Sequence, residues 1–514
     1  MMNIEPSARN LGVVADPAPR HPYHPTPDPA TGELVVDPAV TVIGKGAGLQ
    51  IEFYYLSQST TNNEYGKGRS ASVHCYLLSQ IGGVNAPVVV IRGDNSSAAY
   101  VLTGSSYVAE NAQYSPSSLT FNGSSFTERF PDGTQMVYND HGLDSATGAE
   151  LFKVAKVQTP AGLISTYTYG SGVEANLLKS IQEPAGRLLT LTYAASTTTS
   201  LLSTVQDWGG RVWTLQYDSN RQLTTFTSPL GCATKYSYAN AGASSPMLNT
   251  ITDPRGYTTT YMYTASKQVA SIAAGIAIWT YTYSSTKTAG ISVLVAPSGA
   301  VTTYTLNSSG LLATTNHPEG YTSTFGYDSK NRRVSEQVPS GSRLSLIFND
   351  QSLVTSSTDP LGNITTNQYD ASHNLTTQTD ALGQIWSFTY DASRNMTAKI
   401  DPLGRRTTWT YNGDGSIQSQ QDGRGLITTF SYDTMGNVAS TLYSDGGIVT
   451  NQYDILNRLT TVTDQIGRVS TIAYDQGDNV IGRTNPAGES RRWVYDSCLV
   501  VAEVDPLGYR TSYT

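Results

Sequence analysis

The feature that most constrains this chain is a unit of 21 residues that recurs in phase through its C-terminal part. Its clearest copies open on an Asp-Pro-x-Gly turn, as at Asp359–Gly362, and Tyr-Asp follows ten residues after that Asp, as at Tyr369. Looser copies reach back to Thr159. A repeat of this length predicts stacked supersecondary units. The repeated residues are Gly362, Gly383, Gly404, Gly425, Gly446, Gly467 and Gly488, with Tyr369, Tyr390, Tyr411, Tyr432, Tyr453, Tyr474 and Tyr495.

Each unit has the residue pattern of two short strands and two turns. The first turn has Asp at position i, Pro at i+1 and Gly at i+3, which favours a type I turn. Phe388 and Tyr390 then share one face of a strand with a period of two residues. In the second turn, such as Asp370–Asn374, we expect the Asn to take the left-handed backbone that a tight reversal needs. An apolar residue such as Leu375 opens the returning strand, so each unit is predicted to be a hairpin.

One such unit cannot be stable alone. Burying its Tyr, one further aromatic and one aliphatic residue contributes roughly 5 to 9 kcal/mol, against about 1 to 2 kcal/mol of backbone entropy for each residue ordered. Stacking on neighbours must supply the rest. Because open twisted sheets rarely exceed about ten strands, we predict an all-β fold, in which a YD-repeat array of two-stranded units curls into a spiral β-shell. Its aromatic face must be covered by side chains across the curl or by an enclosed guest.

The chain divides into three regions by composition and repeat. Residues 1–38 are rich in Pro and predict a flexible leader. Residues 39–158 alternate β-rich runs with Gly, Asn and Ser, and predict strands outside the strict repeat. Residues 159–514 form the array, whose last unit, opening at Asp505, is incomplete.

Composition narrows the classes of partner. Charged residues are 14% of the chain and the net charge of -8 is diffuse, with no basic patch, so we expect no nucleic-acid partner. The chain contains no run of about 18 apolar residues, so no transmembrane segment is predicted. Residues 1–20 lack the apolar stretch of a secretory signal.

The sequence offers no catalytic motif. It contains no Gly-x-Ser-x-Gly, no His-Glu-x-x-His and no phosphate loop, so we predict no catalytic residues, no cofactor and no enzyme activity. The run Gly44–Gly48 has neither the Walker spacing nor the dinucleotide-binding spacing of glycines, and it is interpreted as a turn.

Metal binding is also not expected. His21 and His24 lack a carboxylate or Cys partner at ligand spacing, and the recurring Asp residues, although a calcium ladder is conceivable, are explained by their turns. The cysteines Cys75, Cys232 and Cys498 are far apart and are interpreted as buried free thiols.

The Asp-Pro-Leu-Gly and Tyr-Asp pattern, followed by Asn-Leu or Asn-Val, resembles the YD repeat of the RHS family. That family spans bacterial RHS proteins, shell components of insecticidal toxin complexes and animal teneurins. The resemblance runs from Thr159 to the last residue, and the segment from Thr31 to Leu78 is similar to the region before the repeats in bacterial RHS chains. It implies that the repeats wind into a hollow β-shell around a C-terminal toxin or effector.

One departure from that family is clear. Toxin-bearing members end the array in an Arg-Tyr-Tyr-Asp-Pro type of core segment that cuts the cargo free, and nothing here matches it, so no cleavage role is carried onto Asp505. We therefore expect a non-enzymatic encapsulating scaffold, with a toxin or effector cargo or a completing shell polypeptide as partner. The alternative is a cell-surface adhesive or carbohydrate-binding protein. The expected location is secreted or cell-surface, by a route not visible in the sequence, or cytoplasmic before export.

Overall fold

The protein, studied as a computed structural model, consists almost entirely of strands and turns. The structure describes residues 27, 35–36, 39–42, 49–59, 61–79, 88–93, 97–103, 106–109, 117–130, 132–144, 147–194, 200–239, 246–284, 290–337, 341–496 and 499–513. Most of the predicted leader 1–38, with His21 and His24, therefore lies outside the described residues, as do Gly44–Gly48 and Cys498. Within them the only helix is the short 3-10 helix η1 (Gly172–Glu174).

A small sheet formed near the N-terminus has the order β1-β3-β2, with β6 also paired to β3, and β4 and β5 pair as a separate hairpin. Its strands are β1 (Val35–Val36), β2 (Ala39–Val42), β3 (Leu49–Leu56), β4 (Asn62–Asn63), β5 (Gly66–Lys67) and β6 (Arg69–Ala71).

The next strands, β7 to β14, close into a ring. Each pairs with the next in antiparallel fashion, and the first half of β14 pairs back onto β7, with Leu151 opposite Leu78. The second half of β14 pairs with β15, with Val157 opposite Ser165. One long strand therefore both closes the ring and starts the array. The strands are β7 (Tyr76–Ser79), β8 (Val88–Ile91), β9 (Ser97–Thr103), β10 (Ser106–Ala109), β11 (Ser118–Phe121), β12 (Ser125–Arg129), β13 (Gln135–Leu143) and β14 (Glu150–Gln158).

From β15 onward the chain is one antiparallel ribbon in which every strand pairs with its neighbours in sequence. Among the described residues β47 pairs with β46 alone, so the ribbon is open at that end. Its early strands are β15 (Ile164–Tyr169), β16 (Leu178–Gln182), β17 (Leu188–Ala194), β18 (Leu201–Gln206), β19 (Val212–Tyr217), β20 (Leu223–Thr227), β21 (Ala233–Ala239), β22 (Met247–Thr252), β23 (Thr258–Tyr263), β24 (Val269–Ala274), β25 (Ala277–Thr282), β26 (Ile291–Val295), β27 (Val301–Leu306), β28 (Leu312–Asn316), β29 (Thr322–Tyr327), β30 (Arg333–Gln337) and β31 (Arg343–Phe348).

The later strands follow the 21-residue period of the sequence. They are β32 (Val354–Thr358), β33 (Ile364–Tyr369), β34 (Leu375–Thr379), β35 (Ile385–Tyr390), β36 (Met396–Ile400), β37 (Arg406–Tyr411), β38 (Ile417–Gln421), β39 (Ile427–Tyr432), β40 (Val438–Leu442), β41 (Ile448–Tyr453), β42 (Leu459–Thr463), β43 (Val469–Tyr474), β44 (Val480–Thr484), β45 (Ser490–Asp496), β46 (Leu499–Val504) and β47 (Arg510–Ser512).

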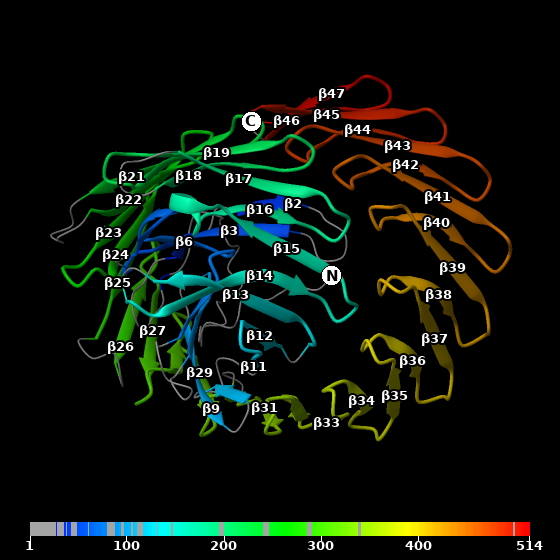
Figure 1. The fold of residues 1–514 in the computed structure, drawn as a ribbon, viewed down its shortest axis with the longest axis horizontal. Helices are drawn as coiled ribbons and strands as arrows, with labels where there is room; N and C mark the ends of the chain where they lie inside the picture. The colour runs from blue at the N-terminus through cyan, green and yellow to red at the C-terminus, as the bar shows by residue number, and fades with distance from the viewer. Residues whose placement is uncertain are drawn as a thin grey trace.

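The ribbon winds around itself (Figure 1). It passes from β15–β19 through β21–β27 and β31–β35 to β37–β43. The turn between β43 and β44 then returns to the turn between β18 and β19, where Arg211 Nη1 donates to Asp478 Oδ2. Almost every unit contains a β-bulge just before its Tyr, as between Thr410 and Tyr411, and a bulge bends its strand and increases the twist. The predicted all-β spiral of two-stranded units is thus confirmed.

The buried side chains gather on the early part of this wall. One cluster joins Ile51, Phe53 and Tyr55 of β3 to the inner face of β16–β24, and a second fills the ring β7–β14. Neither cluster includes a residue of β33–β45. The N-terminal sheet therefore covers the aromatic face of the early units, whereas the same face of the late units is left half-buried.

Candidate functional site

In the units whose first turn begins with Asp, that Asp side chain holds the turn together. In the turn Asp401–Arg405, one carboxylate oxygen accepts the amide hydrogens of Leu403 and Arg405 at 3.0 and 2.9 Å. The other accepts from Arg405 Nε at 2.6 Å. Desolvation acts to raise the pKa of Asp401, but the hydrogen bonds from Arg405 and Leu403 and the Arg405 charge together lower it overall. All seven repeat glycines have a φ between 76° and 87°, a conformation that glycine adopts without strain.

The second turn is built differently from the expectation. The residue in the left-handed conformation is the one before the Asn, for example His373 with a φ of 67°. Asn374 instead donates its side-chain amide to Asp370 Oδ2 at 2.9 Å, while Asp370 Oδ1 accepts the Asn374 backbone amide. The role assigned to the Asn was therefore wrong: it ties the turn together, and a neighbour takes the unusual backbone.

The repeated Tyr makes one recurring contact. Tyr411 Oη donates to the carbonyl oxygen of Met396, 15 residues earlier, at 2.6 Å. Met396 borders the bulge of the preceding unit, where Thr397 has no partner across the ladder. The hydroxyl thus binds a carbonyl at the point where the sheet ladder is interrupted. The same contact is made by Tyr193, Tyr238, Tyr327, Tyr369, Tyr390, Tyr432, Tyr453, Tyr474 and Tyr495.

This contact gives a reason for Tyr rather than Phe in the repeat. We expect Tyr411→Phe to lower the free energy of unfolding by about 1 kcal/mol, because the Met396 carbonyl loses its donor. Tyr509→Phe is the matched control, since the Tyr509 ring is largely exposed and has no such contact. Urea unfolding followed by circular dichroism measures both. Equal stability of the two variants would refute the role of the hydroxyl.

An arginine from the N-terminal sheet is inserted into the aromatic face of the early units. Arg69 is buried, with its guanidinium carbon 4.9 Å from the centre of the Tyr236 ring. Its Nη2 donates to Tyr238 Oη at 3.2 Å. Tyr55 Oη, from the same sheet, accepts the backbone amide of Leu248 at 2.9 Å. The N-terminal sheet is therefore bound to the wall by specific polar contacts.

The ring β7–β14 contains a fully buried carboxylate, Glu128. Arg92 forms a two-pronged ion pair with it, through Nη1 to Oε2 at 2.7 Å and through Nη2 to Oε1. Ser117 and the hydroxyls of Tyr100 and Tyr138 also donate to the two oxygens, at 2.6 to 2.9 Å. Burial acts to raise the pKa of Glu128, but the Arg92 ion pair and the hydroxyl donors lower it overall.

A seam joins two passes of the wall. This contact region, called the seam from here on, lies between the first turns that connect strands within β14–β21 and the second turns that connect strands within β35–β44. Arg187 Nη1 donates to Ile455 O at 3.1 Å and to Asn457 Oδ1 at 3.0 Å, across 268 and 270 residues of sequence. Trp208 Nε1 donates to the same carbonyl of Ile455 at 3.1 Å. One turn tip is thus held by two donors from the other pass.

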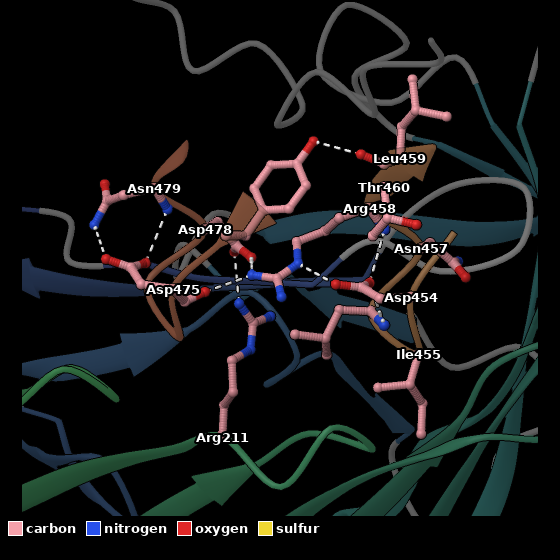
Figure 2. A network of polar contacts seen from close by, with 12 residues as sticks. Arg211, Asp454, Ile455, Asn457, Arg458, Leu459, Thr460, Asp475, Asp478 and Asn479 are labelled. Carbon is pink, nitrogen blue, oxygen red and sulfur yellow. Dashed lines mark hydrogen bonds and ion pairs between the residues drawn. The ribbon is translucent and has the colours of Figure 1, made fainter. Parts of the chain in front are cut away.

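The next contact along the seam is an ion pair (Figure 2). Arg211 Nη1 donates to Asp478 Oδ2 at 2.6 Å. Arg211 Nε donates to Asp207 Oδ2 at 2.7 Å. Arg458 reaches the same tip, with Nη1 3.2 Å from Asp478 Oδ1. Burial acts to lower the pKa of Arg211, but hydrogen bonds to the two carboxylates raise it overall.

Packing at the seam matches large residues with small ones. A Cβ built on Gly209 would lie 2.3 Å from Leu456 Cδ2, and one built on Gly477 would lie 2.3 Å from Leu230 Cδ1. A Cβ on Gly415 would similarly meet Ala161 at 2.3 Å. In each pair glycine provides the space that the partner occupies, so the two passes fit each other closely.

The repeat residues proposed from the sequence do not meet at one place. They recur along the wall, and the glycines and the tyrosines form separate rows. The seam residues Arg187, Trp208 and Arg211 were not identified from the sequence. A signal existed: Trp208 replaces the Pro of the first turn, and an Arg follows the turn acid by four residues in both Glu183–Arg187 and Asp207–Arg211.

Cysteine pairing departs from the expectation. Cys75 is half-buried and its thiol donates to Ser72 O at 3.3 Å, but Cys232 is disulfide-bonded, so the prediction of free thiols is wrong for Cys232. Within the described residues no group of three or more His, Cys, Asp or Glu side chains is placed to hold a metal ion. The same part of the chain contains no helix of the length and apolarity needed to cross a membrane.

Comparison with known proteins gives one family match and several similar structures. Residues 369–406 match the family model described as RHS Repeat. No curated protein sequence matches the chain. A crystal structure of TcdB2-TccC3 aligns with a TM-score of 0.42 at 13% identity, over 93% of this chain and 28% of that one.

Two further structures show the range of these similarities. The Photorhabdus luminescens Tc holotoxin pore aligns with a TM-score of 0.41 at 12% identity, over 91% of this chain and 27% of that one. The N-terminal domain of the effector protein SpvB from Salmonella typhimurium strain LT2 aligns with a TM-score of 0.24 at 13% identity, over 43% of this chain and 98% of that one. The chain spans little more than a quarter of the length of the toxin-complex chains that it matches.

The family match falls on the stretch where the 21-residue period is most regular, and it includes Tyr369, Gly383, Tyr390 and Gly404. The same turns and the same Tyr contact recur in the units on either side. The resemblance predicted from the sequence is confirmed over residues 369–406, which match the RHS repeat.

Proposed function

We propose that this wall encloses a cargo, a C-terminal toxin or a secreted effector, and that the chain itself catalyses no reaction. The chain is a structural scaffold with a shell-like winding (Figure 1). Enclosure of a cargo goes beyond a scaffold role, and this part of the proposal is based on the resemblance to RHS proteins. A secreted or cell-surface location belongs to the same proposal.

The observation that carries the proposal is the uneven cover of the inner face. The N-terminal sheet packs on β16–β24, where Tyr236 and Tyr261 are buried. Both lie two residues before the repeated Tyr. Along β33–β45 the residues at that position, such as Phe388 and Trp409, are only half-buried, and neither buried cluster extends there. An apolar surface of this extent favours a guest, because contiguous exposed apolar patches are rare on soluble proteins.

The test is protection of a guest. A short unfolded reporter peptide with several trypsin sites is fused after Thr514, and its cleavage is compared with that of the free reporter. Enclosure predicts cleavage slowed by about tenfold or more, because a guest inside the wall is cut only when the wall opens. Equal rates for the fused and the free reporter would count against enclosure.

A carbohydrate-binding or adhesive role is the second candidate. It is favoured by two largely exposed aromatic rings on turns, Tyr257 and Tyr509, since a Tyr ring combines a flat apolar face with a polar tip. Binding of the intact chain to a panel of immobilised polysaccharides, lost in Tyr257→Ala and Tyr509→Ala, would support this candidate over enclosure.

A further inference from the structure

Among the described residues, no tip of a second turn packs on the row formed by the first turns of the late units, which have the same form as the first turns at the seam. We call this row the free rim; it consists of the turns beginning at Asp359, Asp380, Asp401, Asp422, Asp464 and Asp505. The early first turns hold the tips of the second turns from the other pass, as described above. The free rim has the same turn geometry, with Gly404 N donating to Asp401 O at 2.9 Å as Gly210 N donates to Asp207 O at 3.1 Å.

A groove of about 470 Å³ lies between two neighbouring turns of the free rim. Its walls include Arg405 of the turn Asp401–Arg405, Gly423 and Arg424 of the turn Asp422–Leu426, and the ring of Trp386. The corresponding space at the seam lies between the turns Glu183–Arg187 and Asp207–Arg211. There it is filled by the tip Ile455–Asn457.

Arg187, which binds the tip Ile455–Asn457 at the seam, has an equivalent in the groove, Arg405. Arg187 is the fifth residue of its turn, donates through Nε to Glu183 at 3.0 Å, and uses Nη1 for the tip. Arg405 is also the fifth residue and donates through Nε to Asp401 at 2.6 Å. Its side chain is 67% exposed, however, against 10% for Arg187. The turn acid thus orients Arg405 and leaves its outer nitrogens available.

The third residue is apolar and exposed in every turn of the free rim except the one beginning at Asp422, where it is Arg424. Leu403 is 78% exposed, and Leu361, Leu382 and Leu507 are exposed to a similar extent. At the seam the equivalent Leu230 packs on the glycine of a tip, Gly477. The free rim therefore presents both the cationic grip and the apolar contact of an established interface, without the tips that complete it.

We propose that a second copy of this chain docks on the free rim, placing the tips of its second turns in these grooves. A second copy is the occupant for which complementarity is shown, since tips and grooves of this same sequence already fit at the seam. Charge supports it: Lys399, Arg405 and Arg424 line the groove, while the two carboxylates there are engaged by their own turns. Asp350 gives one tip an acidic side chain, which is 97% exposed although Lys330 Nζ lies 3.5 Å from it.

Such an interface joins two different surfaces, the free rim of one copy and the tips of the other, so the contact is heterologous and repeats from copy to copy. This inference goes beyond the proposed function, because stacking of walls requires no cargo. It also differs from pairing through the open edge of β47, which uses backbone groups rather than Arg405 and Arg424.

Sedimentation velocity of the intact chain over a range of concentrations tests the proposal. The average mass of the unaltered chain should rise with concentration. The double variant Arg405→Glu and Arg424→Glu should raise the apparent dissociation constant about tenfold or more, because like charges then face the acidic tips. The control is Lys156→Glu with Lys235→Glu, an equal change of net charge on exposed strand positions, which should associate nearly as the unaltered chain does.

Three results would overturn the proposal. They are a chain that stays monomeric at every concentration, association that is unchanged in the rim variant, and equal loss of association in the rim variant and its control. Circular dichroism of each variant confirms that the wall is folded. None of these results bears on reporter protection, so failure of stacking and failure of enclosure can be told apart.

Discussion

The Glu128→Gln variant should unfold with a free energy about 3 to 5 kcal/mol lower than that of the unaltered protein. Glu128 is fully buried, and Arg92 and three hydroxyl groups donate to its two oxygens. Gln keeps the size of the side chain but removes its charge, so the Arg92 guanidinium is left in the ring without its counter-ion. The cost of an uncompensated buried charge explains the expected size of the effect.

Denaturant unfolding at pH 7 measures this loss, and Asp350→Asn is its control. Asp350 also has a cationic partner, Lys330 Nζ at 3.5 Å, but it is 97% exposed. Exposed ion pairs contribute about 0 to 1 kcal/mol, so the control should change little. Similar effects for the two variants would show that the ring does not depend on its buried carboxylate.

The same variant should change the response to acid. The folded-state pKa of Glu128 is lowered, so its contribution to stability is fully present above the pKa of an unfolded Glu, about 4.3. That contribution is lost as the pH falls from there toward the folded-state pKa, because folding then requires a proton to be released. Stability should therefore fall less steeply below about pH 4 in Glu128→Gln than in the unaltered protein.

The Leu456→Asp variant should open the seam while most of the wall stays folded. Leu456 is 6% exposed, and it packs against Gly209 of the other pass. Removing a buried Leu side chain from this contact costs about 1.5 to 3 kcal/mol, and the Asp carboxylate adds a desolvation cost unless the seam opens. We expect the open state to become about a hundredfold more populated, seen as faster amide hydrogen exchange in residues 207–211 and 454–458.

Ile455→Asp is the matched control for this experiment. Ile455 is the neighbouring residue in the same turn, but its side chain is 65% exposed. It engages the seam through its carbonyl oxygen, which the substitution leaves in place. Exchange in the control should stay close to that of the unaltered protein. Equal exchange in the two variants, or a global loss of strand signal in Leu456→Asp alone, would contradict a local opening of the seam.

Much of the wall was predictable because its causes are local. The period of 21 residues, the Asp and Gly of the first turn and the alternation around Tyr390 depend on residues close in sequence, and they led to a curled all-β array. The wrong assignment of the left-handed backbone to Asn374 rather than to His373 has a local origin as well. Asn and its neighbour His373 are both able to close the reversal, and only the amide contact to Asp370 decides between them.

The seam could not be derived in the same way. Its hydrogen bonds join residues 247 to 270 positions apart, so they depend on how far each unit rotates relative to the last. That rotation is set by bulges and side-chain packing, and a small change per unit accumulates over many units. Arg211 and Asp478 therefore meet only because the whole winding has a particular pitch.

The sequence by itself determined the unit, its two turns, the inward row of tyrosines and the need to curl, because each follows from backbone geometry and burial within about 21 residues. The tertiary structure alone decided which surfaces of the wall became covered. The N-terminal sheet lies on β16–β24, Glu128 lies inside a closed ring, and the early turns grip the late tips. These contacts depend on the summed twist of the ribbon and on long-range closure, which no local pattern of residues encodes.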